Sequence, residues 1–355
     1  MGLRNVEEVR CFEMQTKTNN NYSFTWYAII LCFLVMWVHI HNLDIFFTGE
    51  REWIVWIQDT ERRMLGTTAV AGFFALSGYR LFTGFSRDTA ASKLKRRVKS
   101  LLFPYLAWNL IYGVYAFVMA NQPFLHRFAD QKEVSVWQVL QGMLECDLFN
   151  PVFWYVKYLM IFTLAAALFG VLFQNRVWAP VALGLLIVLN VSAAASFLPG
   201  ILPSLLFWGV FFLAGVTLSL YPEIGTWIGQ HKKISLPLSV VVYIICFAGY
   251  YNSQEMGWSL VYHAAIAWFA WNVAGFFGHI TPPQVLTNTF FLYASHWLIA
   301  RNVNKLVCVI FNTDMIWGMM SWCLLPFVIV LICALAKKLL SGKLLPVWSI
   351  LNGGR

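Results

Sequence analysis

The sequence predicts an all-α, polytopic membrane protein with about ten transmembrane helices and both termini in the cytoplasm. Of its 355 residues, 59% are hydrophobic and only 12% are charged, about half the charged fraction of a soluble domain. Aromatic residues are abundant, with 30 Phe, 17 Trp and 14 Tyr, which suits helices anchored at two bilayer interfaces. Long apolar runs also follow one another with short polar loops between them.

The predicted spans follow from these runs, because a spanning helix needs about 20 mainly apolar residues. The windows are Trp26–Phe46, Gly66–Phe85, Ser100–Ala120, Val152–Phe173, Val177–Leu198, Leu202–Tyr221, Ile234–Tyr251, Trp258–Phe277, Val285–Ala300 and Ile316–Leu335. The ninth window is short. Residues Val136–Leu148 are predicted to form a surface helix before the fourth span.

Lysine and arginine set the orientation, because they concentrate in cytoplasmic loops. Of the 25 such residues, sixteen lie in segments that are inside when the N-terminus is inside, and seven lie in the opposite loops. An even number of spans agrees with two cytoplasmic termini. We expect a cytoplasmic tail over residues 1–23, one membrane domain over residues 24–340 and a second cytoplasmic tail over residues 341–355.

Several function classes are disfavoured. The net charge of +9 is explained by the orientation signals, so no nucleic-acid partner is predicted. No zinc-type cysteine spacing occurs, and no metal is expected. The G-x-S-x-G, H-E-x-x-H and P-loop motifs are absent, which disfavours a serine hydrolase, a zinc protease and an ATPase. A disulfide between Cys146 and Cys308, both in predicted outer loops, is an open alternative that the spacing does not support.

Ionisable groups inside a bilayer are costly, so each is a candidate functional residue. His39, Lys157, His263 and His296 are predicted in the outer halves of their spans, whereas Arg80 ends the second span at the inner side. Histidine can take a proton from a hydroxyl, and His39 and His296 come from different spans at similar depth. The alternative for a single membrane histidine is a helix–helix hydrogen bond.

Three stripes at helical spacing combine aromatic and polar side chains. They are Trp154, Lys157 and Tyr158; Tyr293, His296, Trp297 and Arg301; and Phe73, Ser77 and Arg80. Aromatic rings stack on pyranoses while polar groups bind hydroxyls, so these faces favour a sugar-binding cavity. The alternative is interface anchoring and interhelical hydrogen bonding.

The densest basic run, Lys93–Lys99, lies in the predicted cytoplasmic segment that follows the second span. Its cations suit the phosphates of a soluble cytoplasmic ligand. The alternative is a topology signal that binds anionic lipid headgroups.

Several of these segments resemble the acyltransferase-3 family of ten-helix membrane acyltransferases, which modify cell-surface glycans. The first span ends Leu-Val-Met-Trp-Val-His39, and the second contains Phe73-Phe-Ala-Leu-Ser-Gly-Tyr79, similar to the family's Phe-Phe-x-x-Ser-Gly-Tyr. The basic run leads to Pro104-Tyr105, as in the family. Further matches are Phe153–Leu159, Leu202–Gly215 and Phe290–His296. The resemblance extends from about Tyr22 to Leu335.

The resemblance implies transfer of an acyl group, with acetyl expected, from acyl-CoA to a hydroxyl of a cell-surface or lipid-linked glycan, in a bacterial cytoplasmic (inner) membrane. Under this reaction we expect His39 to be the general base, acting directly or within a two-step relay that involves an acylated intermediate. Lys157 is the candidate cation that stabilises the oxyanion, and His296 is expected to orient the acceptor. The donor-binding candidates are Arg80, Lys93, Lys95, Arg96 and Arg97. The acceptor-binding candidates are Trp154, Tyr158, Tyr293 and Ser77. The family usually has an arginine eleven residues before the first-span histidine, where this chain has Ala28, and Arg80 is the candidate replacement.

Two rival interpretations stay open. A transporter or flippase for a lipid-linked glycan would also use intramembrane cations, although the spans show no obvious inverted repeat. The other large class of membrane O-acyltransferases also uses a buried histidine. The Phe-Phe-x-x-Ser-Gly-Tyr segment and the basic run before Pro104-Tyr105 argue against that class.

Overall fold

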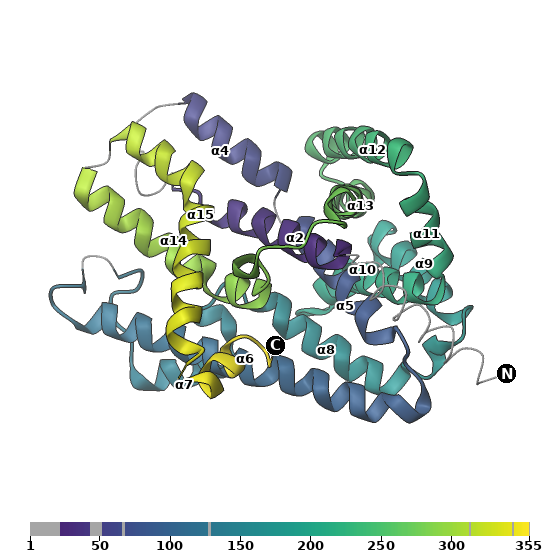
Figure 1. Cartoon of the computed structure of the whole chain (residues 1–355), viewed down its shortest axis with the longest axis horizontal. Coiled ribbons are helices and arrows are strands. Elements are labelled where there is room, and N and C mark those ends of the chain that lie inside the picture. The colour runs from purple at the N-terminus through teal and green to yellow at the C-terminus, as the bar shows by residue number, and fades with distance from the viewer. Residues whose placement is uncertain are drawn as a thin grey trace. The chain divides into compact units, whose positions relative to one another are not determined.

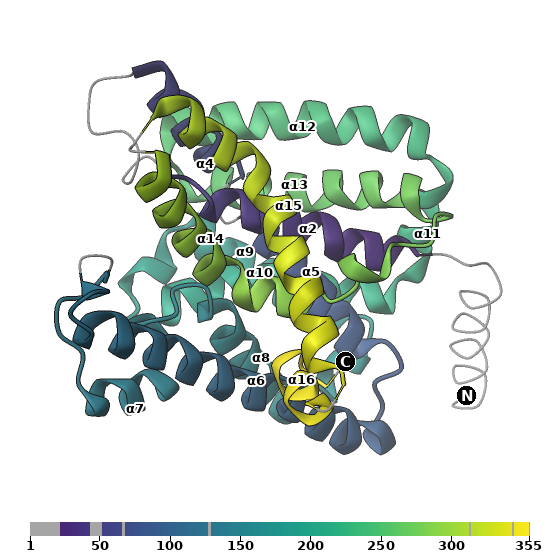
Figure 2. The same cartoon turned by 60° about the vertical axis from the view of Figure 1, so that its left-hand side comes forward.

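The computed structural model describes residues 22–42, 52–65, 68–126, 129–311, 314–342 and 344–354, and the regular elements within them are all helices (Figures 1 and 2). The all-α prediction is therefore confirmed for this part of the chain. Nearly all of the predicted N-terminal tail lies outside the described residues. The chain divides into two compact units. The first comprises Met1–Leu34, Gly66–Lys95 and Ile161–Pro283, and the second comprises Val35–Leu65, Arg96–Met160 and Gln284–Arg355.

A helix overlaps each predicted window. These helices are α2 (Ser23–His39), α5 (Thr68–Phe82), α6 (Arg87–Asn121), α8 (Trp154–Phe169), α9 (Trp178–Val191), α10 (Leu202–Leu220), α12 (Lys232–Ser253), α13 (Met256–Phe277), α14 (Thr289–Phe311) and α15 (Met315–Leu340). In the described part, five of them (α6, α10, α12, α13 and α15) are long and apolar enough to cross a membrane, and α2, α8 and α9 are shorter apolar helices. Ten spans and two cytoplasmic termini stay predictions.

The loops hold further helices. They are α4 (Glu52–Leu65), α7 (Val136–Leu144), α11 (Pro222–Gln230) and α16 (Leu345–Leu351), with 3-10 turns η2 (Cys146–Leu148), η3 (Leu172–Gln174), η4 (Ala194–Phe197) and η5 (Gln284–Leu286). α7 and η2 cover the predicted surface helix. A capping box begins α7, in which Ser135 and Gln138 each accept the other's backbone N–H. Trp137 is exposed whereas Val139 is buried, as expected of a helix that lies on a surface.

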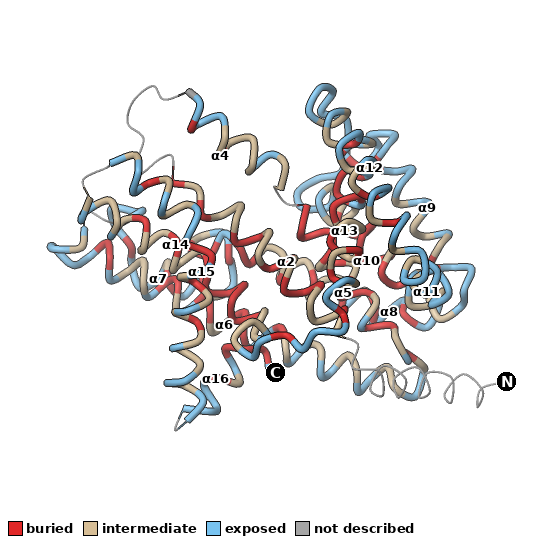
Figure 3. Tube along the Cα trace, turned by 45° about the horizontal axis from the view of Figure 1, so that its top comes forward, coloured by how far each residue is buried: buried red, intermediate tan, exposed pale blue. Residues whose placement is uncertain are grey.

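The first unit is built on a very close crossing of α5 and α10, which Figure 3 shows as largely buried. A Cβ atom on Gly78 would lie 2.1 Å from the carbonyl oxygen of Phe212, and one on Gly215 would lie 1.9 Å from that of Ala75. The two main chains therefore touch, as small residues permit in membrane helices. The glycine of the Phe73–Tyr79 segment thus has a packing role. α13 packs on α5 and pairs with α12.

In the second unit, α14 and α15 lie side by side (Figures 1 and 2). Buried aromatic residues of α6 bind carbonyl groups of other elements. The Tyr112 hydroxyl donates to the Ala294 carbonyl at 3.0 Å, and the Trp108 indole donates to the Leu351 carbonyl at 2.9 Å. These bonds satisfy the polar ends of large apolar side chains.

Large apolar side chains cover the outward faces of several helices. Leu185 and Val188 of α9, Ile244 of α12, and Leu331 and Leu339 of α15 are all exposed. Such faces are unfavourable in water and favourable against lipid. Together with the apolar helices, they support an integral membrane protein.

The suggested disulfide does not form. Cys146 is buried and Cys308 is half-buried, and no disulfide joins them. Burial raises the pKa of Cys146 to about 11, so this thiol stays protonated and is a poor nucleophile.

We predict that Gly215→Ala destabilises the protein by about 1–3 kcal/mol, because the added methyl group overpacks the contact with the Ala75 main chain. Gly184→Ala in α9 is the matched control, since a Cβ atom there contacts nothing within 4 Å. It should be neutral or stabilising. Thermal unfolding followed by size-exclusion chromatography in detergent measures both. Equal midpoints for the two variants would show that the close crossing is wrong.

Candidate active site

His39 and His296 come together in the second unit, as their predicted depths suggested. His39 is the last residue of α2, and His296 lies in α14. Their ring centres are 5.2 Å apart, with the ring planes at 49°. His296 is fully buried and His39 is half-buried. Two imidazoles that are far apart in the sequence therefore lie next to each other within this unit.

The hydrogen bond of His296 fixes its tautomer. Its Nδ1 lies 2.5 Å from the carbonyl oxygen of Tyr293, and a carbonyl oxygen can only accept. Nδ1 therefore carries the proton, and Nε2 carries a lone pair. Nε2 is buried and has no hydrogen-bond partner among the described residues. An unmatched buried acceptor costs free energy and is available to a donor group of a ligand or of the neighbouring ring.

Buried amides hold the chain that follows His39. The Asn304 side chain donates to the Ile40 carbonyl at 3.3 Å. Asn42 and Gln58 bond to each other reciprocally, and the Asn42 amide also donates to the Gly318 carbonyl at 2.8 Å. The end of α2 is thus tied to α4, α14 and α15. These contacts fix the position of His39.

Tyr293 occupies the space between the histidine pair and the start of α8. Its ring lies 6.0 Å from that of His296 and stacks on Phe153 at 5.8 Å. The ring of Tyr155 meets its edge at 5.7 Å. The Tyr293 hydroxyl donates to the Val152 carbonyl, so this predicted acceptor-binding residue offers its ring more than its hydroxyl.

Lys157 is paired with a carboxylate that the sequence analysis did not single out. Its Nζ lies 3.0 Å from Oδ2 of Asp147 in η2, and its side chain is 30% exposed. The ammonium has three N–H donors, so Lys157 could bind an oxyanion while it keeps this bond, with the Asp147 carboxylate offsetting part of its charge. On the same helix, Trp154 and Tyr158 contact each other edge to face at 5.6 Å, and they form the predicted aromatic face of α8.

Arg301, in the predicted stripe of α14, also has a carboxylate partner. Arg301 and Lys305 bind the same oxygen of Asp130, at 2.8 and 2.9 Å. Burial acts to raise the pKa of Asp130, but the hydrogen bonds from Arg301 and Lys305 outweigh burial and lower it. The Arg301 guanidinium also lies over the Trp297 ring, 5.8 Å from its centre. This cluster ties the loop before α7 to α14.

The cationic donor candidates differ in what they contact. Lys93 donates to the carbonyls of Thr83 and Leu81, at the end of α5, which is a favourable place for a cation. Arg80 is exposed on α5. Ala28, at the position of the family's usual arginine, is buried, and Ser77 is buried in α5.

Three more of these cations follow on α6. Lys95 and Arg96 are exposed and Arg97 is half-buried. Arg80, Lys93, Lys95 and Ser77 belong to the first unit, whereas Arg96 and Arg97 belong to the second, with the histidine pair.

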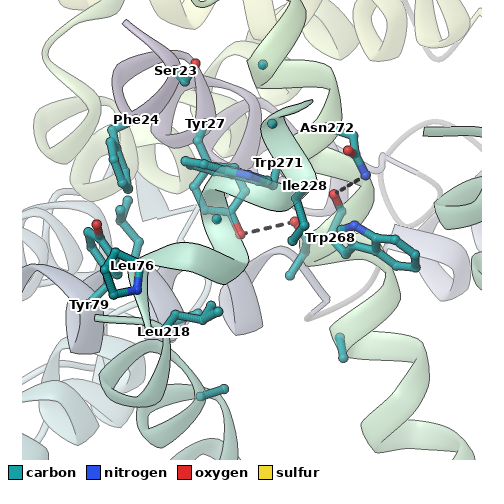
Figure 4. A pocket seen from close by; sticks show the side chains of 18 of the residues that line it. Ser23, Phe24, Tyr27, Leu76, Tyr79, Leu218, Ile228, Trp268, Trp271 and Asn272 are labelled. Atoms are coloured by element: carbon teal, nitrogen blue, oxygen red, sulfur yellow. Dashed lines mark hydrogen bonds between the residues drawn. The ribbon is translucent and has the colours of Figure 1, made fainter. Parts of the chain in front are cut away.

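The first unit contains a cavity of about 890 Å³ that the sequence did not predict (Figure 4). Its walls come from α2, α5, α10, α11, α13 and the first residue of α12. The aromatic residues Phe24, Tyr27, Tyr79 and Trp271 line it, with many alanine and glycine residues. Phe24 stacks on Tyr79 with 5.1 Å between ring centres.

His263, the other predicted membrane histidine, is buried in the first unit. Its ring contacts those of Phe207, Trp208 and Tyr262, and its Nδ1 bonds to the Ser259 carbonyl at 2.7 Å. These contacts support a packing role. Within the described residues, no group of three or more His, Cys, Asp and Glu side chains could hold a metal ion.

Comparison with known proteins identifies the family. The sequence model of the acyltransferase-3 family, described as an acyltransferase domain, matches residues 21–337. No curated protein matches the chain, and no solved structure does. Since the match covers nearly all of the sequence, the chain belongs to the acyltransferase-3 family and is a membrane acyltransferase.

Proposed function

We propose that this acyltransferase moves an acyl group from acyl-CoA to a hydroxyl of a cell-surface or lipid-linked glycan, in the cytoplasmic membrane of a bacterium. The observation that carries the proposal is the His39–His296 pair, with an unmatched lone pair on Nε2 of His296. Membership of the family identifies the reaction class as acyl transfer. The pair supplies a base for a hydroxyl acceptor.

In this proposal His39 is the general base. The sequence suggested that His296 orients the acceptor, but its closeness to His39 favours a role in orienting the base. With ring centres 5.2 Å apart, an N–H of His39 turned toward Nε2 of His296 comes within hydrogen-bonding range, about 3 Å. The other nitrogen of His39 then carries its lone pair toward the acceptor hydroxyl. As the hydroxyl oxygen attacks the thioester carbonyl, its proton passes to His39, and the CoA thiolate leaves with the electrons of the C–S bond.

Other predicted residues take supporting roles. Lys157 would stabilise the oxyanion with N–H donors that Asp147 does not use. The rings of Trp154, Tyr158 and Tyr293 would stack on sugar rings, and Ser77 stays a predicted acceptor contact. Phosphate groups of CoA would bind the basic candidates Arg80, Lys93, Lys95, Arg96 and Arg97, since charge-assisted contacts to phosphate are strong. Acetyl-CoA is the first donor to test.

Both termini are proposed to be cytoplasmic, with the basic run of α6 on the same side. In a variant without its natural cysteines, we predict that Lys233→Cys is labelled by an impermeant maleimide only after cells are opened. Glu133→Cys should be labelled in intact cells. Both side chains are exposed on the protein. Labelling of position 233 from outside would reverse the orientation.

We predict that His39→Ala lowers acyl transfer by about 10²–10⁴-fold, because loss of a general base typically costs that much. His296→Ala should have a smaller effect, since it removes the group that orients the base. Transfer of label from radioactive acetyl-CoA or a longer acyl-CoA to candidate glycans measures both, with the purified protein in lipid nanodiscs. The yield of folded protein is the control. Activity of His39→Ala within threefold of wild type would remove His39 from the mechanism.

The donor site separates an enzyme from a flippase. We predict that replacing Arg96 and Arg97 together with Gln raises the apparent KM for acyl-CoA at least tenfold and that for the glycan little, because two phosphate contacts are lost. Lys337 and Lys338, in the last turn of α15, provide the matched control. Their replacement with Gln should leave donor binding unchanged.

An unchanged donor dissociation constant in the Arg96/Arg97 variant would contradict this donor site. The basic run Lys93–Lys99 would then act only as a topology signal or as a binding site for anionic lipids. If the wild-type protein bound a glycan lipid but no acyl-CoA, the flippase interpretation would replace the proposed reaction.

A further inference from the structure

The residues proposed above for the reaction do not explain the cavity of the first unit. Its position in the helices indicates which side of the membrane it faces. It is lined mainly by the first turns of α2 and α12, by the later turns of α5, α10 and α13, and by α11. In the proposed orientation these segments are the cytoplasmic ends of their helices. The cavity would therefore meet a ligand that arrives from the cytoplasm, as acyl-CoA does.

The polar groups around the cavity are mostly bonded within the protein. The Tyr27 hydroxyl donates to the Ala267 carbonyl at 3.2 Å, as Figure 4 shows, and the Trp268 indole donates to the Ser235 hydroxyl at 3.1 Å. A ligand with many hydrogen-bonding groups would lose its water partners here without replacement. The walls therefore suit an apolar group.

Asn272 provides one unmatched acceptor in the wall. Its side-chain nitrogen donates to the carbonyls of Ser235 and Trp268, at 3.3 and 3.2 Å, which fixes the orientation of the amide. The opposite atom, Oδ1, is buried and has no hydrogen-bond partner in the described part of the chain. One ligand N–H or O–H could bind there, whereas the rest of the ligand should be apolar.

α11 leaves room in the cavity instead of filling it. Gly225 and Gly229 lie four residues apart, on one face of this short helix, and both line the cavity. A Cβ atom added to either glycine would contact nothing within 4 Å. The wall is thus open at the two positions where a side chain would reduce the volume.

The volume exceeds what an acetyl group needs. A methyl group occupies about as much space as one water molecule, roughly 30 Å³, in a cavity of about 890 Å³. Atoms that line an unfilled space lose dispersion contacts. A longer chain restores them, and each buried methylene strengthens binding by about fourfold.

A cation borders this apolar space. Lys232 is half-buried in the wall and donates to the Gly275 carbonyl at 2.7 Å, and Lys233 beside it is exposed. Ammonium groups at the edge of an apolar space favour a ligand whose apolar chain is followed by a polar part. In acyl-CoA this polar part begins with the uncharged pantetheine arm, so Lys232 and Lys233 mark the mouth of the cavity and are not the phosphate site proposed above.

From these observations we infer that the cavity holds the acyl chain of a medium-chain or longer acyl-CoA. The inference rests on the proposed acyl-CoA-dependent transfer, and it replaces acetyl with a longer chain as the group transferred. Lys232 and Lys233 would lie toward the pantetheine arm, while the rings of Phe24, Tyr27 and Trp271 would contact the chain.

The chain-length preference tests this inference directly. In lipid nanodiscs, which avoid detergent in the cavity, kcat/KM is measured with acetyl-, butanoyl- and octanoyl-CoA. We predict a value for octanoyl-CoA at least a hundredfold above that for acetyl-CoA, because six more methylenes are buried. A preference for acetyl-CoA would overturn the inference and leave the proposed transfer intact. Transfer from none of these donors would overturn the transfer reaction itself.

Glycine variants locate the preference in the cavity. Gly225→Leu should lower the octanoyl-to-acetyl ratio at least tenfold, because the new side chain takes the space of several methylenes, and Gly229→Leu should act in the same direction. Gly184→Leu is the matched control, since its Cβ position is equally open but lies outside the cavity, and its ratio should equal that of the wild type. If both cavity variants kept the wild-type ratio, the chain would bind elsewhere.

A photoreactive probe distinguishes the donor from a bilayer lipid. Octanoyl-CoA with a diazirine at the end of its chain should label α11 or α13, and excess octanoyl-CoA should prevent the labelling while excess acetyl-CoA should not. Labelling of the same helices by a photoreactive phosphatidylethanolamine that octanoyl-CoA fails to displace would assign the cavity to a membrane lipid.

Discussion

The histidine pair depends on a buried carboxamide network at the end of α2. A helix end leaves carbonyl groups without partners, and inside a bilayer the protein itself must supply those partners. Asn304 binds the Ile40 carbonyl, while Asn42 joins Gln58 and the Gly318 carbonyl. Because each carboxamide both donates and accepts, the network leaves little freedom for the chain after His39. His39 is therefore positioned by groups that have no part in proton transfer.

Small residues serve two opposite purposes in the first unit. At Gly78 and Gly215 the missing side chain lets two main chains touch, which brings α5 and α10 together. At Gly225 and Gly229 the missing side chain leaves space that no other group fills. The first pair stabilises the unit through contact. The second pair allows a large apolar cavity to persist beside the cytoplasmic ends of the proposed spans.

Much of this arrangement follows from the sequence, and the exceptions have physical reasons. The lengths of the apolar runs predicted the main helices. The positions of His39 and His296 in their predicted spans placed both histidines at a similar depth in the membrane. Helix α4 was missed because its sequence mixes charged and apolar side chains. Asp147 was missed because nothing in the sequence pairs a single carboxylate of a surface helix with a lysine of the following span. The cavity was also missed. Its open wall consists of glycines, which give no signal of whether they allow contact or leave space.

The close crossing of α5 and α10 constrains how relatives of this protein can diverge. A tight contact between two side chains can be relieved when one shrinks as the other grows, so such positions change in pairs. The atoms that oppose Gly78 and Gly215 are main-chain carbonyl oxygens, which every residue carries. No exchange at position 212 or 75 can make room, so a second-site suppressor of a larger residue at 78 or 215 would have to move a whole helix. These two glycines should therefore stay fixed in homologues that keep the crossing, whatever donor or acceptor those homologues use.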